Sequence, residues 1–432
     1  MTQSRSVRSL AGLAAMVLLM SACGNGEPTE TEASPTPTQQ AETEGNQQEA
    51  ETEGLVLGSL LPETGDLAFL GEGMIAATEM AVADMNEAGG VLGQDVELIN
   101  ADEGDQAGTV REGADRLIGS GVDGIVGAAS SGQSLEVLDT ITGAGVLQCS
   151  GSNTSPTFTE EDEDLYFRTA PSDALQGPVL ADLVAAQGHS EVGILARADD
   201  YGQGLADATA TALEEVGATV VAQEIYDPDT ATFDAEVSQM QDAGAGAVVL
   251  ISFEEGVSIL QSLIESGMGP QDIGIFGADG LRSEGLPTEV EPGNPNALDG
   301  MRGTAPDPGA DEDFLQRLDE SAGGLEETVF AAQKYDCAVL TGLAAIAADS
   351  TDGAEMADNV IGLLQGDNEC TSFEECAELL RNGESIAYRG PSGVTELTEA
   401  GDPASGTYEI WRYQDGELST VETREATVSG SG

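Results

Sequence analysis

The sequence predicts an α/β protein with two Rossmann-like lobes, each built on a parallel sheet, joined by a multi-strand hinge. The chain has 432 residues, and a single hydrophobic core rarely grows beyond about 250 to 300 residues. From Leu55 onward, short apolar runs alternate with helical patterns, which is typical of a parallel sheet with helices on both faces. The alternation begins afresh after YFRTAPSD, so we expect a second lobe there.

Four apolar runs predict the strands of the first lobe, namely LVLGSLL, VELIN, GIVGA and GVLQC. Between them, MIAATEMAVADMNEAG and TVREGADRLIGSG have the pattern of helices, and Gly89 and Gly90 close the first of these. The second lobe repeats the order with the strands EVGILA, VVAQEIY, GAVVLIS and IGIFG. Helices are expected between these strands near residues 205–216, 233–243 and 256–266.

The two lobes also resemble each other in detail. RLIGSGVDGIVGAASSGQSLEVL and MQDAGAGAVVLISFEEGVSILQSL each run through a helix, a Gly-rich turn, a strand, a polar loop and a helix. In open α/β sheets, ligands bind beyond the carboxyl ends of the strands. We therefore expect the loops GAASSGQS and ISFEEG to form opposite walls of one cleft.

The last third of the chain is expected to complete both lobes. The segment 311–348 has a helical pattern rich in Ala and Leu and should pack on the first lobe, while GTYEIWRYQDGEL predicts a hairpin that turns at Asp415 and Gly416. We assign residues 55–171 and 305–388 to the first lobe, residues 172–304 and 389–425 to the second, and 426–432 to a tail. Several crossings between lobes would form a hinge.

The N-terminus has the features of an export signal. Arg5 and Arg8 precede a short apolar run, so residues 1–22 are interpreted as a signal peptide. LLMSAC resembles a bacterial lipobox, which predicts a lipidated Cys23 and an anchor on the outer face of the cell membrane. The alternative is cleavage after Ala22 without lipid. Residues 23–54 lack large apolar side chains and are expected to form an acidic, disordered linker.

The charge of the chain excludes some partners. It has 14 basic and 79 acidic residues, for a net charge of −65, and Lys334 is its only lysine. Nucleic acid binding depends on basic side chains, so we expect no nucleic acid partner. The acidic excess is typical of a halophilic protein, which such groups keep hydrated and soluble.

The sequence argues against catalysis and against a bound metal. A serine hydrolase could use Ser130, Ser131 or Ser134, but it needs a base, and the only histidine, His189, belongs to a helix-to-strand turn away from these serines. LGEGMIAA is a weak dinucleotide motif because it does not open directly from a strand. One histidine and scattered cysteines do not suit zinc. We expect no enzyme activity, cofactor or metal.

Four cysteines remain after Cys23, and an even number in an exported chain favours disulfides. Cys370 and Cys376 form the most local pair. Cys149 would then pair with Cys337 by elimination, and free buried thiols are the alternative.

Several segments together resemble the type I periplasmic binding proteins of ABC transporters, and among them the leucine/isoleucine/valine-binding group. The resemblance covers residues 55 to about 413 and rests on the order of TGDLAFLG, NEAGGVLGQDVEL, GAASSGQS, CSGSNTSP, YFRTAPSD, DDYGQG, FGADG, CTSFEEC and GPSGVTEL. It implies two lobes that close over a small amino acid, a membrane permease as partner, and a monomer.

The resemblance also implies roles for matching positions. Ser131 and Thr154, with backbone N–H groups of the loops SSG and SNT, would bind the α-carboxylate, and Asp279 would pair with the α-ammonium. Tyr201 would cover the ligand from the second lobe. The full set of implied ligand-binding residues is Leu70, Ser130, Ser131, Ser152, Asn153, Thr154, Tyr201, Phe253 and Asp279.

The chemistry of these residues supports the same roles. The chain has few cations, but the N–H groups at the start of a helix attract a carboxylate. Two alternatives remain open. The same fold could bind an amide, a urea-like compound or a small carboxylate, or it could act as a sensory module.

Overall fold

The computed structural model describes residues 54–161, 164–307 and 312–428. The predicted signal peptide, Cys23 and all of the predicted linker except Gly54 lie outside the described residues, as do residues 429–432 of the predicted tail. Within the described part of the chain, no helix is both long and apolar enough to cross a membrane.

The first sheet has five parallel strands in the order β2-β1-β3-β4-β5. The strands are β1 (Val56–Leu61), β2 (Glu97–Asp102), β3 (Gly124–Gly127), β4 (Leu147–Ser150) and β5 (Tyr166–Arg168). The helices that follow the first four are α1 (Ala68–Glu87), α2 (Ala107–Gly119), α3 (Ser131–Gly143) and the short α4 (Thr157–Glu160). The four predicted strands are confirmed. The sequence analysis missed β5, because three residues are too few to show a pattern.

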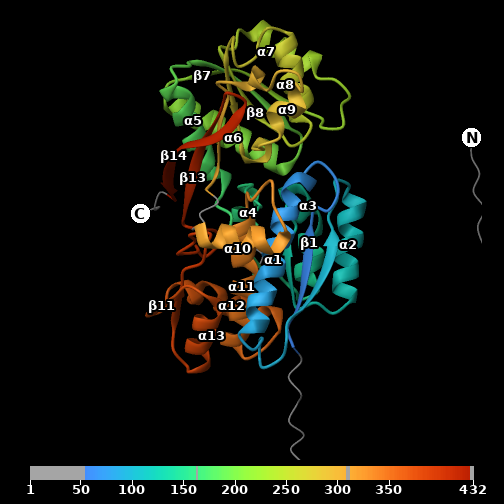
Figure 1. The fold of residues 1–432 in the computed structure, drawn as a ribbon, viewed down its shortest axis with the longest axis vertical. Helices are drawn as coiled ribbons and strands as arrows, with labels where there is room; N and C mark the ends of the chain where they lie inside the picture. Colours follow the sequence, from blue (N-terminus) through green and yellow to red (C-terminus); the bar gives the residue numbers. More distant parts are fainter. Residues whose placement is uncertain (1–53, 162–163, 308–311, 429–432) are drawn as a thin grey trace, which may run out of the picture. The chain divides into compact units, whose positions relative to one another are not determined.

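Apolar side chains cover both faces of this first sheet. On one face, α2 and α3 pack over Leu60, Ala101 and Ile125. On the other face, α1 packs with the later helices over Leu57 and Val126. The sheet is thus sandwiched between helices, as the alternation of apolar runs predicts (Figure 1).

The second sheet has seven strands in the order β14-β13-β10-β9-β8-β6-β7. Its strands are β6 (Glu191–Arg197), β7 (Thr219–Tyr226), β8 (Ala247–Ile251), β9 (Gly274–Gly277), β10 (Arg302–Pro306), β13 (Ser405–Gln414) and β14 (Glu417–Thr427). Its helices are α5 (Asp173–Ala186), α6 (Asp200–Glu215), α7 (Asp234–Ala243), α8 (Gly256–Glu265) and α9 (Leu286–Val290), with a 3₁₀ turn, η1 (Asp279–Leu281), after β9.

The predicted hairpin forms one edge of this second sheet. β13 pairs with β10 and β14 in antiparallel fashion, whereas the other pairs are parallel, so the sheet is mixed and not wholly parallel. Asp415 and Gly416 both have positive φ, 57° and 75°, as a two-residue type I′ turn requires. β14 continues to Thr427 and so extends into the predicted tail.

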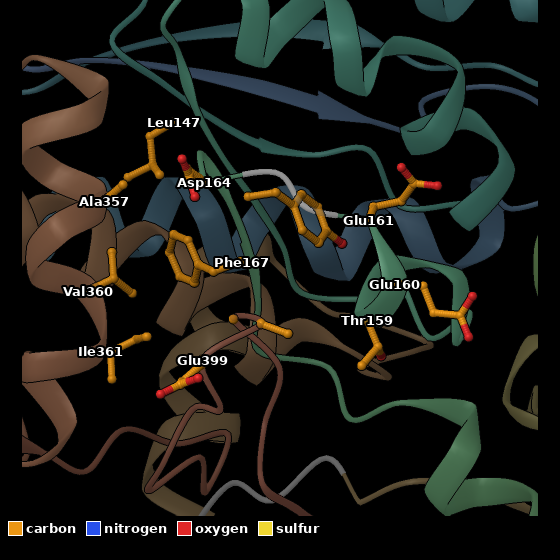
Figure 2. A pocket seen from close by; sticks show the side chains of 13 residues that line it. Leu147, Thr159, Glu160, Glu161, Asp164, Phe167, Ala357, Val360, Ile361 and Glu399 are labelled. Carbon is orange, nitrogen blue, oxygen red and sulfur yellow. The ribbon is translucent and has the colours of Figure 1, made fainter.

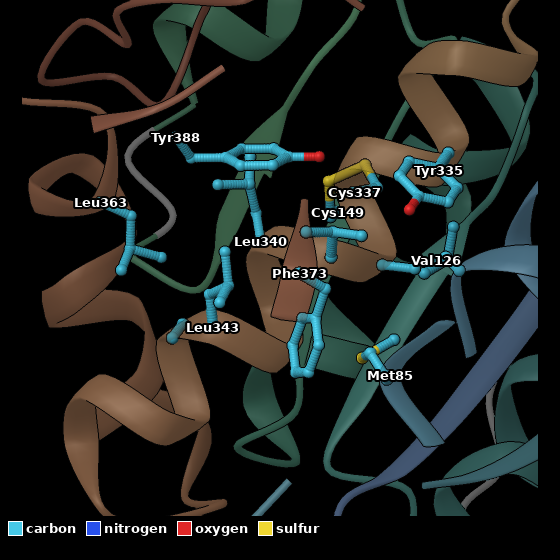
Figure 3. Close-up of a cluster of buried hydrophobic side chains, with 14 of the residues drawn as sticks. Met85, Val126, Cys149, Tyr335, Cys337, Leu340, Leu343, Leu363, Phe373 and Tyr388 are labelled. Carbon is cyan, nitrogen blue, oxygen red and sulfur yellow. A yellow bond between two sulfur atoms is a disulfide. The ribbon is translucent and has the colours of Figure 1, made fainter. Parts of the chain in front are cut away.

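The late helices complete the first lobe. They are α10 (Glu312–Ala322), α11 (Ala331–Ala348), α12 (Gly353–Val360) and α13 (Phe373–Arg381), with the short parallel strands β11 (Asn368–Cys370) and β12 (Ile386–Tyr388). Figure 3 shows their core, in which Leu340 and Leu343 of α11 lie near Phe373 and Met85. Disulfides join Cys149 to Cys337 and Cys370 to Cys376. The first bond holds α11 against β4.

The chain crosses between the sheets three times. It passes from β5 to α5, returns to the first lobe after β10, and reaches the second sheet again at β13. Val394 and Leu397 pack in the core of the first lobe, and Asp402 pairs with the buried Arg168 at 2.6 Å. These contacts favour a last crossing near Ser405 over the predicted boundary at residue 389.

Candidate ligand-binding site

A small cavity of about 20 Å³ lies where the strand-end loops of the two lobes meet. Its walls contain seven of the nine residues that the sequence analysis implicated: Leu70, Ser130, Ser131, Ser152, Tyr201, Phe253 and Asp279. Leu67, Met74, Ala129, Gly280 and Phe330 also line it. The sequence analysis missed these five, because apolar and glycine residues in a wall carry no chemical signature of their own.

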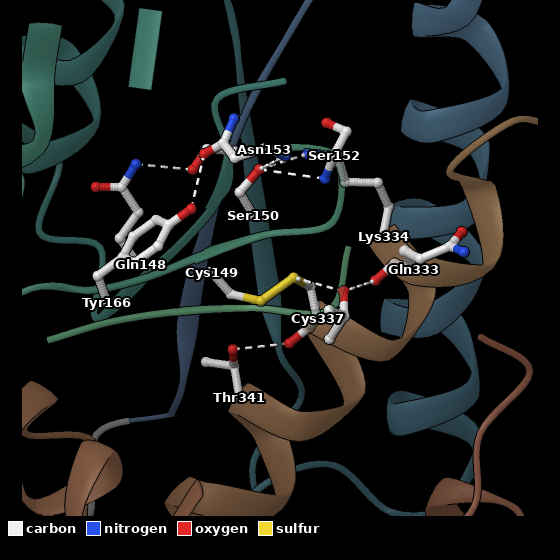
Figure 4. Close-up of a disulfide and its surroundings, with 12 residues drawn as sticks. Gln148, Cys149, Ser150, Ser152, Asn153, Tyr166, Gln333, Lys334, Cys337 and Thr341 are labelled. Atoms are coloured by element: carbon white, nitrogen blue, oxygen red, sulfur yellow. Dashed lines mark hydrogen bonds between the residues drawn. A yellow bond between two sulfur atoms is a disulfide. The ribbon is translucent and has the colours of Figure 1, made fainter. Parts of the chain in front are cut away.

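Asn153 and Thr154 do not line this cavity. The Asn153 side-chain N–H donates to the carbonyl of Ala129 at 2.9 Å, and its side-chain oxygen accepts from the Tyr166 hydroxyl at 2.9 Å. Figure 4 shows Asn153 beside Tyr166. The Thr154 N–H donates to the Ser131 hydroxyl oxygen at 3.3 Å. In this conformation both residues fix the first-lobe loops, and their contact with a ligand stays a prediction.

The first lobe presents the start of α3 to the site. The N–H groups of Ser131, Gly132 and Gln133 find no acceptor in the described ranges of the chain. Such first-turn N–H groups carry the positive end of the helix dipole and attract an anion. The Ser131 hydroxyl stands beside them and already accepts the N–H groups of Thr154 and Ser155. Its own proton can therefore point to a ligand.

Other backbone donors that the sequence analysis gave to the ligand are bound within the protein. The Ser130 N–H donates to the carboxylate of Glu103 at 3.1 Å, and the Ala129 N–H binds the same carboxylate. The N–H groups of Ser152 and Asn153 donate to the Ser150 hydroxyl oxygen at 3.3 and 3.1 Å. In this conformation these N–H groups of the SSG and SNT loops are already bonded, so their part in binding a carboxylate stays a prediction.

The second lobe presents Asp279, which begins η1 beyond the end of β9. Its carboxylate accepts from the Gln176 side chain at 2.7 Å and from the Tyr201 hydroxyl at 3.1 Å. Burial raises the pKa of Asp279 to about 6, and these two hydrogen bonds oppose the rise. At neutral pH, Asp279 is thus an anion with only neutral donors, and it lacks a cationic partner in the described chain.

A second buried carboxylate, Asp173, lies at the start of α5, where the chain crosses between lobes. Neither of its oxygens has a hydrogen-bond partner among the described residues. The side chain of Thr154 lies near the carboxylate and lowers its pKa. Burial raises the pKa of Asp173 well above its ordinary value, and the charge of Asp279 raises it further. Burial thus disfavours the charged form of Asp173. Sequence reasoning missed it, since a single Asp after Ser172 is typical of a helix start.

The apolar part of the site centres on Phe253. Its ring stacks on Tyr201 with the centroids 5.2 Å apart, and the Arg197 guanidinium lies 3.6 Å from the Phe253 centroid. A second cavity, of about 120 Å³, has Phe253 and Gly280 in its wall as well. The apolar side chains of Phe69, Val257, Leu281 and Leu286 complete much of that wall. Glu254, Ser283 and Glu289 also line it, so the site borders a chamber that is partly apolar and partly acidic.

Ion pairs connect the lobes around the site. Arg282, after η1, pairs with Glu327 of the first lobe at 3.0 Å and also with Glu409 of β13. Arg197 lies 4.0 Å from Asp66 of the first lobe. These contacts hold the two lobes together on either side of the cavity.

Larger hollows lie elsewhere in the described chain. One of about 470 Å³ lies between β4, β5 and α12 of the first lobe (Figure 2). Carboxylates and apolar side chains line it, including Glu160, Glu161 and Glu399. Several carboxylates among its described lining residues would repel the carboxylate of a ligand.

The only histidine of the chain is not among the described residues that line the site. His189 lies in the turn before β6, at the opposite end of the strand from the site, and packs edge-on against Phe276. The predicted separation of His189 from the serines is thus confirmed. No group of three or more potential metal ligands occurs in the described part of the chain. The geometry suits binding of a small polar molecule with an apolar side chain.

Comparisons with known proteins agree with this geometry. A family model described as periplasmic binding protein matches residues 55–399. A Leu/Ile/Val-binding protein homolog of Brucella melitensis is 28% identical over 378 residues, which cover 85% of this chain and 94% of the relative. A second such homolog, from Brucella abortus, is 30% identical over 370 residues, which cover 84% of this chain and 91% of the relative.

Two solved structures share the fold. A leucine-binding protein from Thermotoga maritima matches with a TM-score of 0.72 and 20% identity over 85% of this chain and 98% of its own. The branched-chain amino acid transporter substrate binding protein of Streptococcus pneumoniae, solved with isoleucine, matches with a TM-score of 0.70 and 21% identity over 86% of this chain and 100% of its own. The chain therefore belongs to the type I periplasmic binding proteins, in the Leu/Ile/Val-binding family.

Proposed function

We propose that this protein binds a branched-chain or related small amino acid between its lobes and delivers it to an ABC permease. One observation carries the proposal. Anion-binding N–H groups of α3 stand on one wall of the cavity, and the unpaired carboxylate of Asp279 stands on the other. This arrangement is complementary to a zwitterion.

The α-carboxylate would lie at the first turn of α3. The N–H groups of Ser131, Gly132 and Gln133 and the Ser131 hydroxyl supply its donors. These dipoles act at short range, so they bind a carboxylate without a cationic side chain. A neutral zwitterion also approaches a strongly acidic protein without net repulsion.

The α-ammonium would pair with Asp279. A cation beside this buried carboxylate forms a charge-assisted hydrogen bond, which is stronger than the bonds from Gln176 and Tyr201 alone. The ligand side chain would lie against Phe253, Leu70 and Met74. This apolar wall favours leucine, isoleucine and valine, which the names of the relatives also indicate.

Binding would require opening and closure of the lobes. A cavity needs about 10 to 15 Å³ to hold one water molecule, so 20 Å³ does not admit an amino acid. The lobes would separate to receive the ligand and close on it, using the crossings between the two sheets as a hinge. The protein would release the ligand unchanged.

We further propose that the protein is exported by its signal peptide and anchored through a lipidated Cys23. The acidic linker would let the body reach a permease in the same membrane. The whole chain has a net charge of −65, and its acidic excess would keep the body soluble and monomeric in a salty medium.

A thermal-shift screen tests the ligand. Purified protein in high salt is heated with leucine, isoleucine, valine, alanine, small amides and small carboxylic acids. A ligand that binds the native state raises the melting temperature. We expect the largest shifts from the branched-chain amino acids. Shifts from acids that lack an ammonium, with none from amino acids, would instead favour a small carboxylate as ligand.

A further inference from the structure

We propose that Glu103 and Lys334 are positioning residues that fix the ligand-facing loop 127–131 from behind and set the strength of carboxylate binding. The inference rests on the proposed function, because it concerns the same loop. Neither side chain lines the cavity, and both are buried, with 1% and 0% exposed.

The two residues hold the same peptide group from opposite ends. Glu103 follows β2, and its carboxylate accepts the N–H of Ala129 and, at 3.1 Å, the N–H of Ser130. Lys334 lies in the first turn of α11, and its ammonium lies 3.4 Å from the Ala128 carbonyl oxygen. A negative group at the N–H and a positive group at the carbonyl of one peptide align with its dipole. The pair therefore fixes the orientation of the Ala128–Ala129 peptide.

Hydrogen bonding alone does not explain a lysine at this position. The Ala128 carbonyl oxygen also accepts from Ser150 at 2.7 Å, Ser134 at 3.2 Å and Asn153 at 3.3 Å. A carbonyl oxygen has two lone pairs, so these neutral donors already satisfy it. Figure 4 shows Lys334 next to Ser150, with which its ammonium forms a further bond of 3.4 Å. Lys334 differs from these neutral donors because it adds a positive charge opposite Glu103.

Glu103 in turn determines which donors a ligand meets. It occupies two N–H groups that precede α3, so the ligand carboxylate meets only the next three, those of Ser131, Gly132 and Gln133. An unbalanced Glu103 charge would lie one turn behind these donors and repel an incoming carboxylate. Lys334 balances that charge, in a site where burial makes each charge act strongly.

The charges of the pair respond to pH. Burial raises the pKa of Glu103 to about 7, and its bonds to Ala129 and Ser130 and the charge of Lys334 oppose the rise, while Asp102 adds to it. Burial lowers the pKa of Lys334 to about 7, and Glu103 opposes that change. Above neutral pH the pair loses a proton and becomes negative, which weakens carboxylate binding. Below neutral pH it becomes positive.

The test compares Glu103→Gln, Lys334→Met and the variant with both changes. Leucine affinity is measured by calorimetry at pH 7.0 and 8.5, and the melting temperature is measured without ligand. We expect Lys334→Met to lower affinity severalfold at pH 7.0, because the Glu103 that stays ionised is then unbalanced. The loss is limited because, without the Lys334 charge, the pKa of Glu103 rises and part of it becomes neutral. The double variant should bind better than the product of the single losses predicts, and its affinity should no longer fall between pH 7.0 and 8.5.

A role limited to stability would lower the melting temperature and leave the affinity of the folded protein unchanged, and that result would overturn the proposal. If the single variants do not fold, the test uses the wild-type protein alone. Leucine affinity of the wild type that does not change between pH 7.0 and 8.5 would contradict the proposal.

A ligand-free arm separates this inference from the proposed function. Amide hydrogen exchange of residues 127–131 should be faster in Glu103→Gln than in the wild type, with no change in β6. If wild-type protein binds no amino acid but exchange in the loop depends on Glu103, the proposed function fails and the positioning role stands. Unchanged exchange in the loop would contradict the positioning role whatever the protein binds.

Discussion

At the scale of single residues, the site depends on carboxylates whose environments differ. Asp279 accepts two hydrogen bonds and ionises with a pKa of about 6. Asp173 has no well-formed hydrogen bond among the described side chains, and burial raises its pKa well above the ordinary value. Burial raises the pKa of both carboxylates, but only Asp279 has two hydrogen-bond donors that favour its charged form.

Replacing Asp279 with Asn should weaken amino acid binding. Removing one partner of a buried charge pair costs about 2 to 5 kcal/mol, so calorimetry should find a loss of at least about 30-fold in affinity for leucine. Asp272→Asn is the matched control, because Asp272 is exposed before the same strand β9. Equal affinity in the two variants would remove Asp279 from the site.

Replacing Asp173 with Asn should stabilise the protein at alkaline pH. The raised pKa means that the native state holds a proton that the unfolded chain releases, so the stability linked to this proton is present at low pH and is lost as pH rises through the native pKa. Asn keeps the size and cannot ionise. Denaturant unfolding should show a higher midpoint for the variant at pH 8 and a similar one at pH 4. A lower midpoint at pH 8 would show that the Asp173 carboxylate is ionised and paired.

At the scale of elements, α11 organises the first lobe. Its side chains are buried along most of its length, and Cys337 binds it to β4. Lys334 lies in its first turn, and Phe330, which lines the cavity, directly precedes the helix. The helix therefore joins the core of the lobe to its binding face.

Loss of the disulfide at α11 should cost more stability than loss of the local one. Cys149 and Cys337 are 188 residues apart, whereas Cys370 and Cys376 are 6 apart. A long closed loop restricts the unfolded chain more, and a native disulfide typically contributes about 2 to 5 kcal/mol. Guanidinium unfolding of the paired Cys→Ala variants should show the larger loss for Cys149 and Cys337. The reverse order would mean that packing around the local disulfide outweighs loop length.

The sequence predicted most of the strands and most of the cavity wall, because periodicity and strand-end loops are local signals. It did not predict β5, β10, β11 or β12. Nor did it predict a role for Glu103, Gln176 or Asp173. These residues lie near the site because the fold brings distant segments of the chain into contact. The second sheet also differs from the expectation, since the pairing of β13 with β10 depends on the crossing of the chain, which no local pattern shows.

At the scale of the whole molecule, two acidic lobes come together, and few cations are available to form ion pairs between them. Arg282 of the second lobe pairs with Glu327 of the first, and burial raises the pKa of Glu327. Such a contact exists only when the lobes are together, so it favours the closed state. A ligand shifts the same equilibrium by its differential affinity for the closed form.

Replacing Glu327 with Gln should therefore shift the protein toward the open state. Arg282 keeps Glu409, so its charge stays paired. We expect a severalfold loss of leucine affinity and a larger radius of gyration without ligand in small-angle X-ray scattering. Glu326→Gln is the control, because that neighbour is exposed. Identical scattering and affinity in both variants would exclude the pair from closure.

The most direct test of the central claim is a crystal structure of the protein with leucine. We predict leucine between the lobes, with its carboxylate at the first turn of α3 and its ammonium within hydrogen-bond distance of Asp279. Leucine bound elsewhere, or bound there with its two charged ends exchanged, would contradict the claim that these two walls recognise a zwitterion.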